Sequence, residues 1–212
     1  MVKWLRLFSV LLALVTGAAP AAYAQREGAF ALGANVSTRE PVDGAADSGM
    51  GIGLLWRVGH SKNGWGWTGG LNWFATDLNR SIGGHDTELG ELRVRPFMAG
   101  YGYTHLVGPA ALSAGVLGGY AFTSFHLAQT AVDAYHDRLG ARSVSADVSN
   151  TWVAKPEVGV WIDLNRKVGL NLNAGYLIAR PTMTVSSSLG DDVRRLRADM
   201  FIITIGAVYS IF

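Results

Sequence analysis

The chain has no cysteine, few charged residues and, after its first residues, no long apolar run. The lack of cysteine excludes a disulfide framework and a lipid-anchored lipoprotein. Charged residues make up 16% of the sequence, against about 25% in soluble domains. No later segment approaches the ~18 consecutive apolar residues of a transmembrane helix. An apolar chain without such a span has the composition expected of a membrane β-barrel.

The N-terminus has the pattern of a secretory signal peptide. Lys3 and Arg6 precede a short apolar run, and a small-x-small cleavage site ends at Ala24. We therefore expect a cleaved signal peptide over residues 1–24 and a barrel domain over residues 25–212. Removing Lys3 and Arg6 from the 18 basic residues leaves 16, equal to the 16 acidic residues. This balance argues against nucleic-acid binding.

Stretches in which every second residue is apolar recur along the chain, and Gly49–Gly59 is the clearest. Successive side chains of a strand point to opposite faces, so each stretch has one continuously apolar face. The pattern predicts an all-β protein, an eight-stranded antiparallel transmembrane up-and-down β-barrel that turns its apolar face to lipid. The expected strands are Ala29–Thr38, Gly49–Gly59, Trp65–Thr76, Glu91–Tyr103, Ala111–Leu127, Thr151–Leu164, Val168–Met183 and Ala198–Phe212.

The connectors between the expected strands alternate in length. Short turns at 60–64, 104–110 and 165–167 alternate with long polar loops at 39–48, 77–90, 128–150 and 184–197. Outer-membrane barrels place short turns on the periplasmic side and long loops outside. The alternation therefore favours a bacterial outer membrane location over a soluble barrel.

Polar residues in the middle of strands define the expected lumen, whereas Leu92, Val94 and Met98 are assigned to the lipid-facing side. Unpaired burial of charge is costly, so we expect the lumen charges to form a network, with Arg95–Glu157 as its central pair. Such a network is a polar plug that fixes strand registry or, alternatively, a gate or proton path. Its predicted members are Arg57, Glu91, Arg93, Arg95, Lys155, Glu157 and Asp163.

The segment Arg95–Tyr103 and the terminal Phe212 resemble the small outer-membrane β-barrel family, typified by the OmpA transmembrane domain, OmpX and OmpW. The resemblance covers the whole mature chain. It implies that the outer-membrane assembly machinery recognises the C-terminal strand ending in Phe212. It also implies contact with outer-membrane lipid and a protein that we expect to be a monomer.

Four arginines near the expected outer end of the last strands could bind lipopolysaccharide phosphates, because arginine forks match phosphate geometry. Solvated loop charges are the alternative account, since Asp191 and Asp192 share the same loop. The four residues are Arg180, Arg194, Arg195 and Arg197.

Two groups could carry chemistry. Asp133, His136 and Asp137 could chelate a metal, but their spacing is not diagnostic and a loop offers no preformed geometry. Ser124 and His126 share one strand face near the outer interface, but residues two apart lie ~7 Å from each other and no acid is evident. We therefore expect no enzyme, no metal site and no cofactor.

The most favoured function is that of a structural outer-membrane barrel with surface-exposed loops and a polar-plugged lumen, serving envelope integrity or surface interaction. Eight strands enclose a lumen filled by side chains, without an open pore. Two alternatives remain: a lipid-modifying enzyme at the outer interface, and a narrow transporter or channel for small hydrophobic solutes.

Overall fold

The computed structural model describes residues 30–42, 48–58, 63–108, 110–165 and 167–211. The expected signal peptide (1–24) and Phe212 lie outside the described residues, so both stay predictions.

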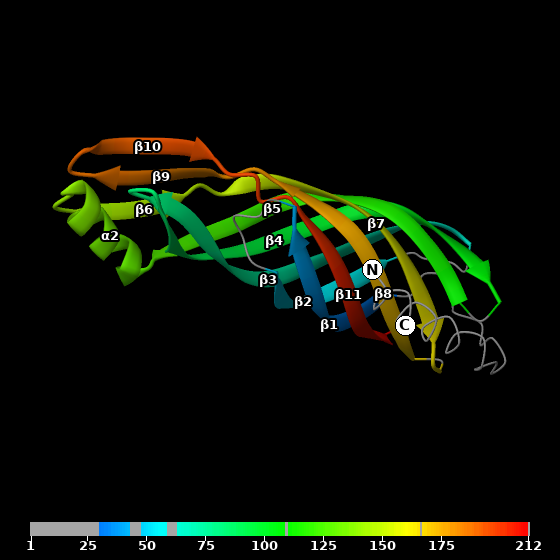
Figure 1. The fold of residues 1–212 in the computed structure, drawn as a ribbon. Coiled ribbons are helices and arrows are strands. Elements are labelled where there is room, and N and C mark those ends of the chain that lie inside the picture. The colour runs from blue at the N-terminus through cyan, green and yellow to red at the C-terminus, as the bar shows by residue number, and fades with distance from the viewer. Residues whose placement is uncertain (1–29, 43–47, 59–62, 109, 166, 212) are drawn as a thin grey trace.

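Eight antiparallel strands close into a barrel in the order β1-β11-β8-β7-β5-β4-β3-β2 (Figure 1). Each strand except β11 pairs with the next barrel strand along the chain, and β11 closes the ring by pairing with β1. This confirms the predicted up-and-down barrel. The strands are β1 (Phe30–Pro41), β2 (Gly49–Val58), β3 (Gly64–Ile82), β4 (His85–Val107), β5 (Ala110–Leu127), β7 (Thr151–Asp163), β8 (Val168–Ala179) and β11 (Met200–Ser210).

The long connectors, predicted as polar loops, are largely ordered. Residues 77–90 continue β3 and β4 as one hairpin that turns at Gly83 and Gly84, both with positive φ (60° and 81°). Such a turn suits glycine because it has no Cβ. The other connectors contain α2 (Gln129–Leu139) and a three-stranded sheet of β6 (Val144–Val148), β9 (Thr182–Ser187) and β10 (Gly190–Arg195).

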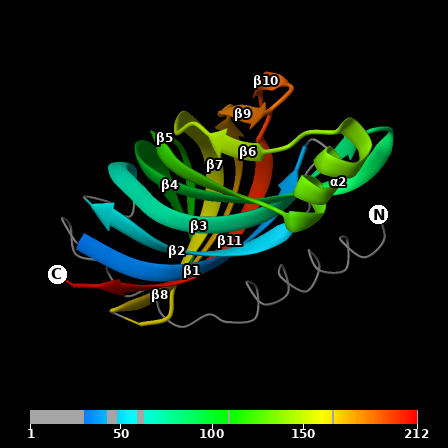
Figure 2. The same ribbon diagram turned by 90° about the vertical axis from the view of Figure 1, so that its left-hand side faces the viewer.

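Together, α2, β6, β9, β10 and the upper ends of β3–β5 form an extension beyond the barrel (Figures 1 and 2). We call the end that carries the extension upper, and the end with the short turns lower. The two ends of the described barrel, Phe30 and Ile211, meet at the lower end through a backbone hydrogen bond of 2.9 Å. Among the described residues no helix is long and apolar enough to cross a membrane.

The outer face of the barrel is apolar. Large exposed side chains include Ile52, Val116, Trp152 and Phe201, the last three 59%, 78% and 58% exposed. Cross-strand aromatic pairs lie near both ends, such as Trp65–Tyr101 and Tyr120–Trp152, with ring centroids 5.4 and 5.3 Å apart. Aromatic girdles on an apolar outer band are typical of barrels whose solvent is lipid.

The phase of β4 differs from the prediction. Leu92, Val94 and Met98 point inward and are at most 2% exposed, whereas Arg93 and Arg95 lie on the outer face. The upper interior is apolar, so the rule that polar residues face the lumen fails for this half of the strand. Phe97, Tyr101 and Tyr103 share the outward phase with the arginines, which the sequence pattern could have shown.

Proline interrupts the hydrogen-bond ladder at two places. The β3–β4 register passes from Leu71↔Phe97 to Phe74↔Val94, with Pro96 in the gap. The β7–β8 register passes from Ala154↔Ile178 to Glu157↔Gly175, with Pro156 in the gap. Proline has no N–H to donate, so each site weakens the wall locally.

Leu177 tests the packed interior of the barrel. This side chain is 0% exposed, so Leu177→Ala should lower the unfolding free energy in lipid by about 2–5 kcal/mol. Leu112, 47% exposed on the outer face, is the matched control, and Leu112→Ala should cost clearly less. Urea titration of protein refolded in lipid vesicles measures both. Equal losses would contradict a packed interior.

Candidate functional site

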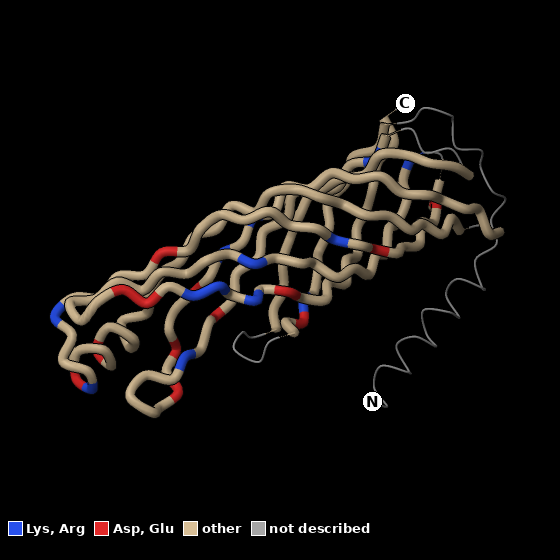
Figure 3. Tube along the Cα trace, turned by 90° about the horizontal axis from the view of Figure 1, so that it is seen from above, with Lys and Arg blue, Asp and Glu red and all other residues tan. Residues whose placement is uncertain are grey.

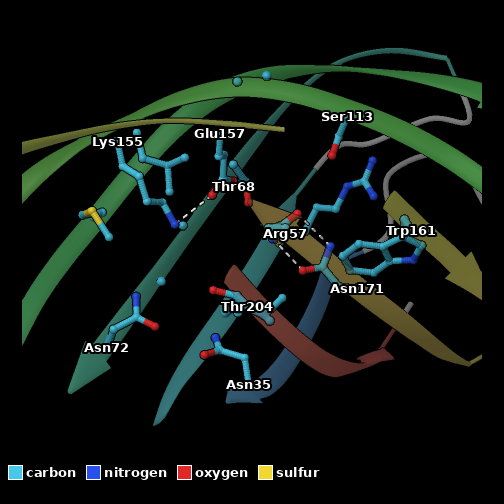
Figure 4. Close-up of a pocket in the computed structure, with 18 of the residues that line it drawn as sticks. Asn35, Arg57, Thr68, Asn72, Ser113, Lys155, Glu157, Trp161, Asn171 and Thr204 are labelled. Atoms are coloured by element: carbon cyan, nitrogen blue, oxygen red, sulfur yellow. Dashed lines mark hydrogen bonds and ion pairs between the residues drawn. The ribbon is translucent and has the colours of Figure 1, made fainter. Parts of the chain in front are cut away.

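The lower lumen is filled by a polar plug built around Arg57. Arg57 is 6% exposed, and its Nη2 donates to Thr104 Oγ1 at 2.7 Å. Its guanidinium carbon lies 4.8 Å from the centroid of the Trp161 ring. Trp161 Nε1 in turn donates to Asp163 Oδ1 at 3.2 Å. The structure thus brings Arg57 of β2, Thr104 of β4 and Trp161 of β7 together across the lumen. Figure 4 shows Arg57 beside Trp161.

A second part of the polar plug is an ion pair within β7. Lys155 Nζ lies 2.8 Å from Glu157 Oε2, and the two side chains are 10% and 12% exposed. Two lumen amides on β8 also bond to each other, Asn173 Nδ2 donating to Asn171 Oδ1 at 2.6 Å. The paired charges and amides leave a polar pocket of only about 60 Å³ among them, so this part of the lumen is largely filled by side chains. Asn35, Asn72 and Thr204 complete the polar lining.

The predicted Arg95–Glu157 pair is wrong. Glu157 faces the lumen, whereas Arg95 is exposed on the outer face of β4. Glu91 and Arg93 also belong to that outer face, where they form an ion pair with each other. Of the seven residues expected in the lumen network, Arg57, Lys155, Glu157 and Asp163 line or adjoin the plug.

The upper lumen is an apolar chamber. Two adjoining pockets that share Leu78 and Leu196 define it. The pocket nearer the barrel has a volume of about 60 Å³ and is lined by Leu92, Val94 and Met200 together with Arg39 and Asp199. The pocket nearer the extension has a volume of about 170 Å³ and is lined by Leu89, Met183 and Val185 on one part and by Arg80, Asp192 and Arg194 on another. Buried side chains of α2 and β6 join the same apolar cluster, so the extension continues the packed apolar core upward.

Beside these pockets the barrel wall is uneven in height, and we use the word slit for the upper edge of β3 that no barrel strand pairs with among the described residues. β2 pairs with β3 only as far as Gly51↔Phe74, whereas β3 continues to Ile82. In the described chain, β10 pairs only with β9. The Arg80–Asp192 ion pair joins the two free edges. Side-chain charges are denser here and in the extension than along the lower barrel (Figure 3).

Asp199 anchors the upper ends of three barrel strands. It is 1% exposed, accepts from the Ala179 N–H at 3.1 Å and lies 3.1 Å from Arg197 Nε. Arg180 Nη2 lies 3.6 Å away, and the Val42 N–H donates to the Asp199 carbonyl at 3.1 Å. A buried carboxylate needs such partners. Sequence reasoning missed Asp199, although its position between arginines and a strand start was a usable signal.

The four arginines predicted to contact lipopolysaccharide divide into two groups. Arg180 and Arg197 are 53% and 58% exposed and converge on Asp199. Hydrogen bonds to Asp199 and Tyr176 raise the pKa of Arg197. Arg194 lies 3.1 Å from Asp192, and Arg195 is exposed on β10.

Neither chemical group considered from the sequence is assembled as a site. Asp133 accepts from Gln129 at 2.8 Å, and the described residues contain no cluster of three or more potential metal ligands. Glu91 lies opposite His126 in the β4–β5 register, the acid that sequence reasoning lacked. Glu91, however, pairs with Arg93, and the Ser124 hydroxyl is buried without a partner among the described residues.

The fold places the chain among the eight-stranded barrels of the outer-membrane type. Its sequence matches no protein-family model and no curated protein. The structure is similar to outer membrane protein OprG from Pseudomonas aeruginosa (TM-score 0.73, 17% identity, covering 88% of this chain and 97% of OprG). It is also similar to Neisserial surface protein A (TM-score 0.54, 13% identity, covering 88% of this chain and 100% of that protein). A third similar structure is E. coli Outer Membrane Protein W (TM-score 0.51, 17% identity, covering 87% of this chain and 98% of that protein). These similarities confirm the expected resemblance at the level of the fold.

The Lys155–Glu157 pair provides a test of the polar plug. Removing one partner leaves the other charge buried and unpaired, so Lys155→Met or Glu157→Met should each lower the unfolding free energy by about 3–5 kcal/mol. The double variant Lys155→Met/Glu157→Met should recover most of that loss. Urea titration in lipid vesicles gives the coupling energy. Additive losses would show that the two groups do not interact.

The Arg80–Asp192 pair makes the slit sensitive to pH. Hydrogen bonds from Arg80 and Arg194 lower the pKa of Asp192. The pairing therefore contributes fully above the unfolded pKa of about 3.9 and is lost as pH falls through the lower folded value. Spin labels on Ser81→Cys and Val193→Cys should report a single distance between pH 5 and 8 and a broadened distribution in stronger acid.

Asp192→Asn should broaden that distance at neutral pH. Asp191 forms no ion pair among the described residues, so Asp191→Asn is the matched control and should change nothing. A distance insensitive to both acid and Asp192→Asn would rule out a role of this pair in holding the slit.

Proposed function

We propose that the protein resides in the bacterial outer membrane and admits small apolar solutes from outside into the upper lumen. The observation that carries this proposal is the division of the lumen: an apolar chamber above, a polar plug below.

The polar plug determines where a solute can go. An apolar molecule in the upper chamber meets Arg57 and the Lys155–Glu157 pair below it, and displacing these paired groups is costly. The slit, by contrast, begins beside Phe74 and Trp73 on the membrane-facing wall. The solute therefore leaves sideways into the membrane, without crossing to the periplasm. This route retains the expected absence of an open pore.

Contacts with lipid follow from the proposed location in the outer membrane. The apolar outer band contacts acyl chains, and the exposed Arg180 and Arg197 bind lipopolysaccharide phosphates at the upper rim. Because both arginines are oriented by Asp199, they form a more preorganised pair than Arg194 and Arg195.

A role in surface interaction is the second candidate. It is favoured by exposed apolar side chains at the tip of the extension, where Leu189 and Val193 are 64% and 62% exposed. Single exposed apolar residues are common on proteins. This observation therefore supports surface interaction less strongly than the division of the lumen supports solute entry.

Uptake across a lipopolysaccharide leaflet tests the proposed function. Vesicles with lipopolysaccharide outside and phospholipid inside are mixed with N-phenylnaphthylamine, an apolar dye that fluoresces in the bilayer. Wild-type protein should accelerate uptake. Leu196 lines both parts of the chamber, so Leu196→Trp should return the rate to that of protein-free vesicles.

Val193→Trp, which adds the same side chain to an exposed site on β10, is the control and should keep the wild-type rate. Folding of each variant is checked by heat-modifiable gel migration. Equal rates with and without folded wild-type protein would refute solute entry.

A further inference from the structure

Arg39 is a buried cation at the base of the apolar chamber that the polar plug does not use. It lies near the upper end of β1, is 3% exposed, and lines the lower of the two chamber pockets. The neighbouring strand makes room for it: a Cβ at Gly49, its cross-strand partner, would collide with the guanidinium. The guanidinium reaches across to β3, with its carbon 6.0 Å from the centroid of the Phe74 ring.

The hydrogen-bonding capacity of Arg39 is not used up. Its Nε and Nη1 are buried and meet no acceptor among the described residues. An unsatisfied buried donor costs about 1–3 kcal/mol and a charged one more. The other buried arginine of the lumen, Arg57, also leaves its Nε without a partner among the described residues, but its Nη2 donates to Thr104. A buried, unsatisfied charged group in a folded protein calls for an explanation, and a bound ligand with acceptor atoms would supply one.

The lumen acids do not neutralise Arg39. Asp199 is the one carboxylate among the residues that line this pocket, and Arg197, Arg180 and the Ala179 N–H engage it. Asp77 on β3 interacts electrostatically with Arg39, but its side chain is exposed on the outer face and forms no ion pair with the guanidinium. The chamber therefore presents one buried positive group that forms no ion pair among the described residues.

The wall that carries Arg39 is polar, and the wall opposite is apolar. Ser37 and Asn35 follow Arg39 down the inner face of β1, and each has a buried oxygen without a partner among the described residues. Leu92, Val94 and Met200 line the same pocket from β4 and β11. A ligand that fits this chamber has an apolar body and a polar end.

We propose that Arg39 binds a carboxylate, and that the solutes of the chamber are apolar molecules ending in a single carboxylate, of the medium-chain fatty acid type. This inference rests on the proposed entry of apolar solutes and specifies their class. The guanidinium fork matches a carboxylate with two parallel N–H···O bonds. The acyl chain extends along Leu92 and Leu78 toward the upper pocket.

Binding of a matched pair of ligands tests the proposal. Octanoate and octanol share a chain length and differ in the charge of the head group. Each is titrated at neutral pH into full-length protein in lipid nanodiscs by calorimetry, with empty nanodiscs subtracted. Wild type should bind octanoate more tightly than octanol.

The variants separate the head group from the chamber. Arg39→Gln should weaken octanoate binding about 10- to 100-fold, the worth of charge-assisted hydrogen bonds, and leave octanol binding unchanged. Arg39→Lys should restore part of the octanoate affinity. Arg142, exposed in the connector after α2, is the control, and Arg142→Gln should leave both ligands unaffected. Heat-modifiable migration confirms that every variant is folded.

The outcomes distinguish this inference from the function on which it rests. If octanol binds to wild type and octanoate binds equally to wild type and Arg39→Gln, the role of Arg39 is refuted and solute entry stands. If neither ligand binds to wild type above empty nanodiscs, solute entry itself is refuted.

Discussion

The closed hydrogen-bond ladder is the constraint on which the rest of the structure depends. In an apolar solvent a strand edge cannot leave its N–H and C=O groups unpaired, so the barrel strands must pair around the full ring. That closure fixes which face of each strand meets lipid and which meets the narrow lumen. Among the described residues the β2–β3 ladder stops above Gly51↔Phe74, beside the chamber. The site is thus a consequence of where pairing ends.

The sequence predicted the eight strands well because alternation over a half-buried sheet is a direct signal of side-chain direction. Gly49–Val58 shows it most clearly, with apolar residues outward and mainly glycine and Arg57 inward. It failed for β4, where both faces carry apolar residues and Arg93 and Arg95 face outward. Alternation shows only that the two faces of a strand differ. Where both the lumen and the outer wall are apolar, it does not tell which face points inward.

The site was predicted only where its chemistry is local. Lys155 and Glu157 are two residues apart on one face, so their pairing follows from strand geometry. The partners of Asp199 lie on two other segments, and the Arg80–Asp192 pair joins residues 112 positions apart. Such contacts depend on the path of the long connectors. These were expected as loops, because polar composition does not reveal that they continue as sheet.

The central claim is that the lumen has an apolar chamber above a closed polar plug. The most direct measurement is a crystal structure of the protein soaked with 1-bromooctane, with anomalous scattering used to locate bromine. The account predicts bromine in the upper chamber near Leu92 and Met200, and none below Arg57. Bromine distributed past Arg57 to the lower mouth, or absent from the chamber in a fully soaked crystal, would contradict it.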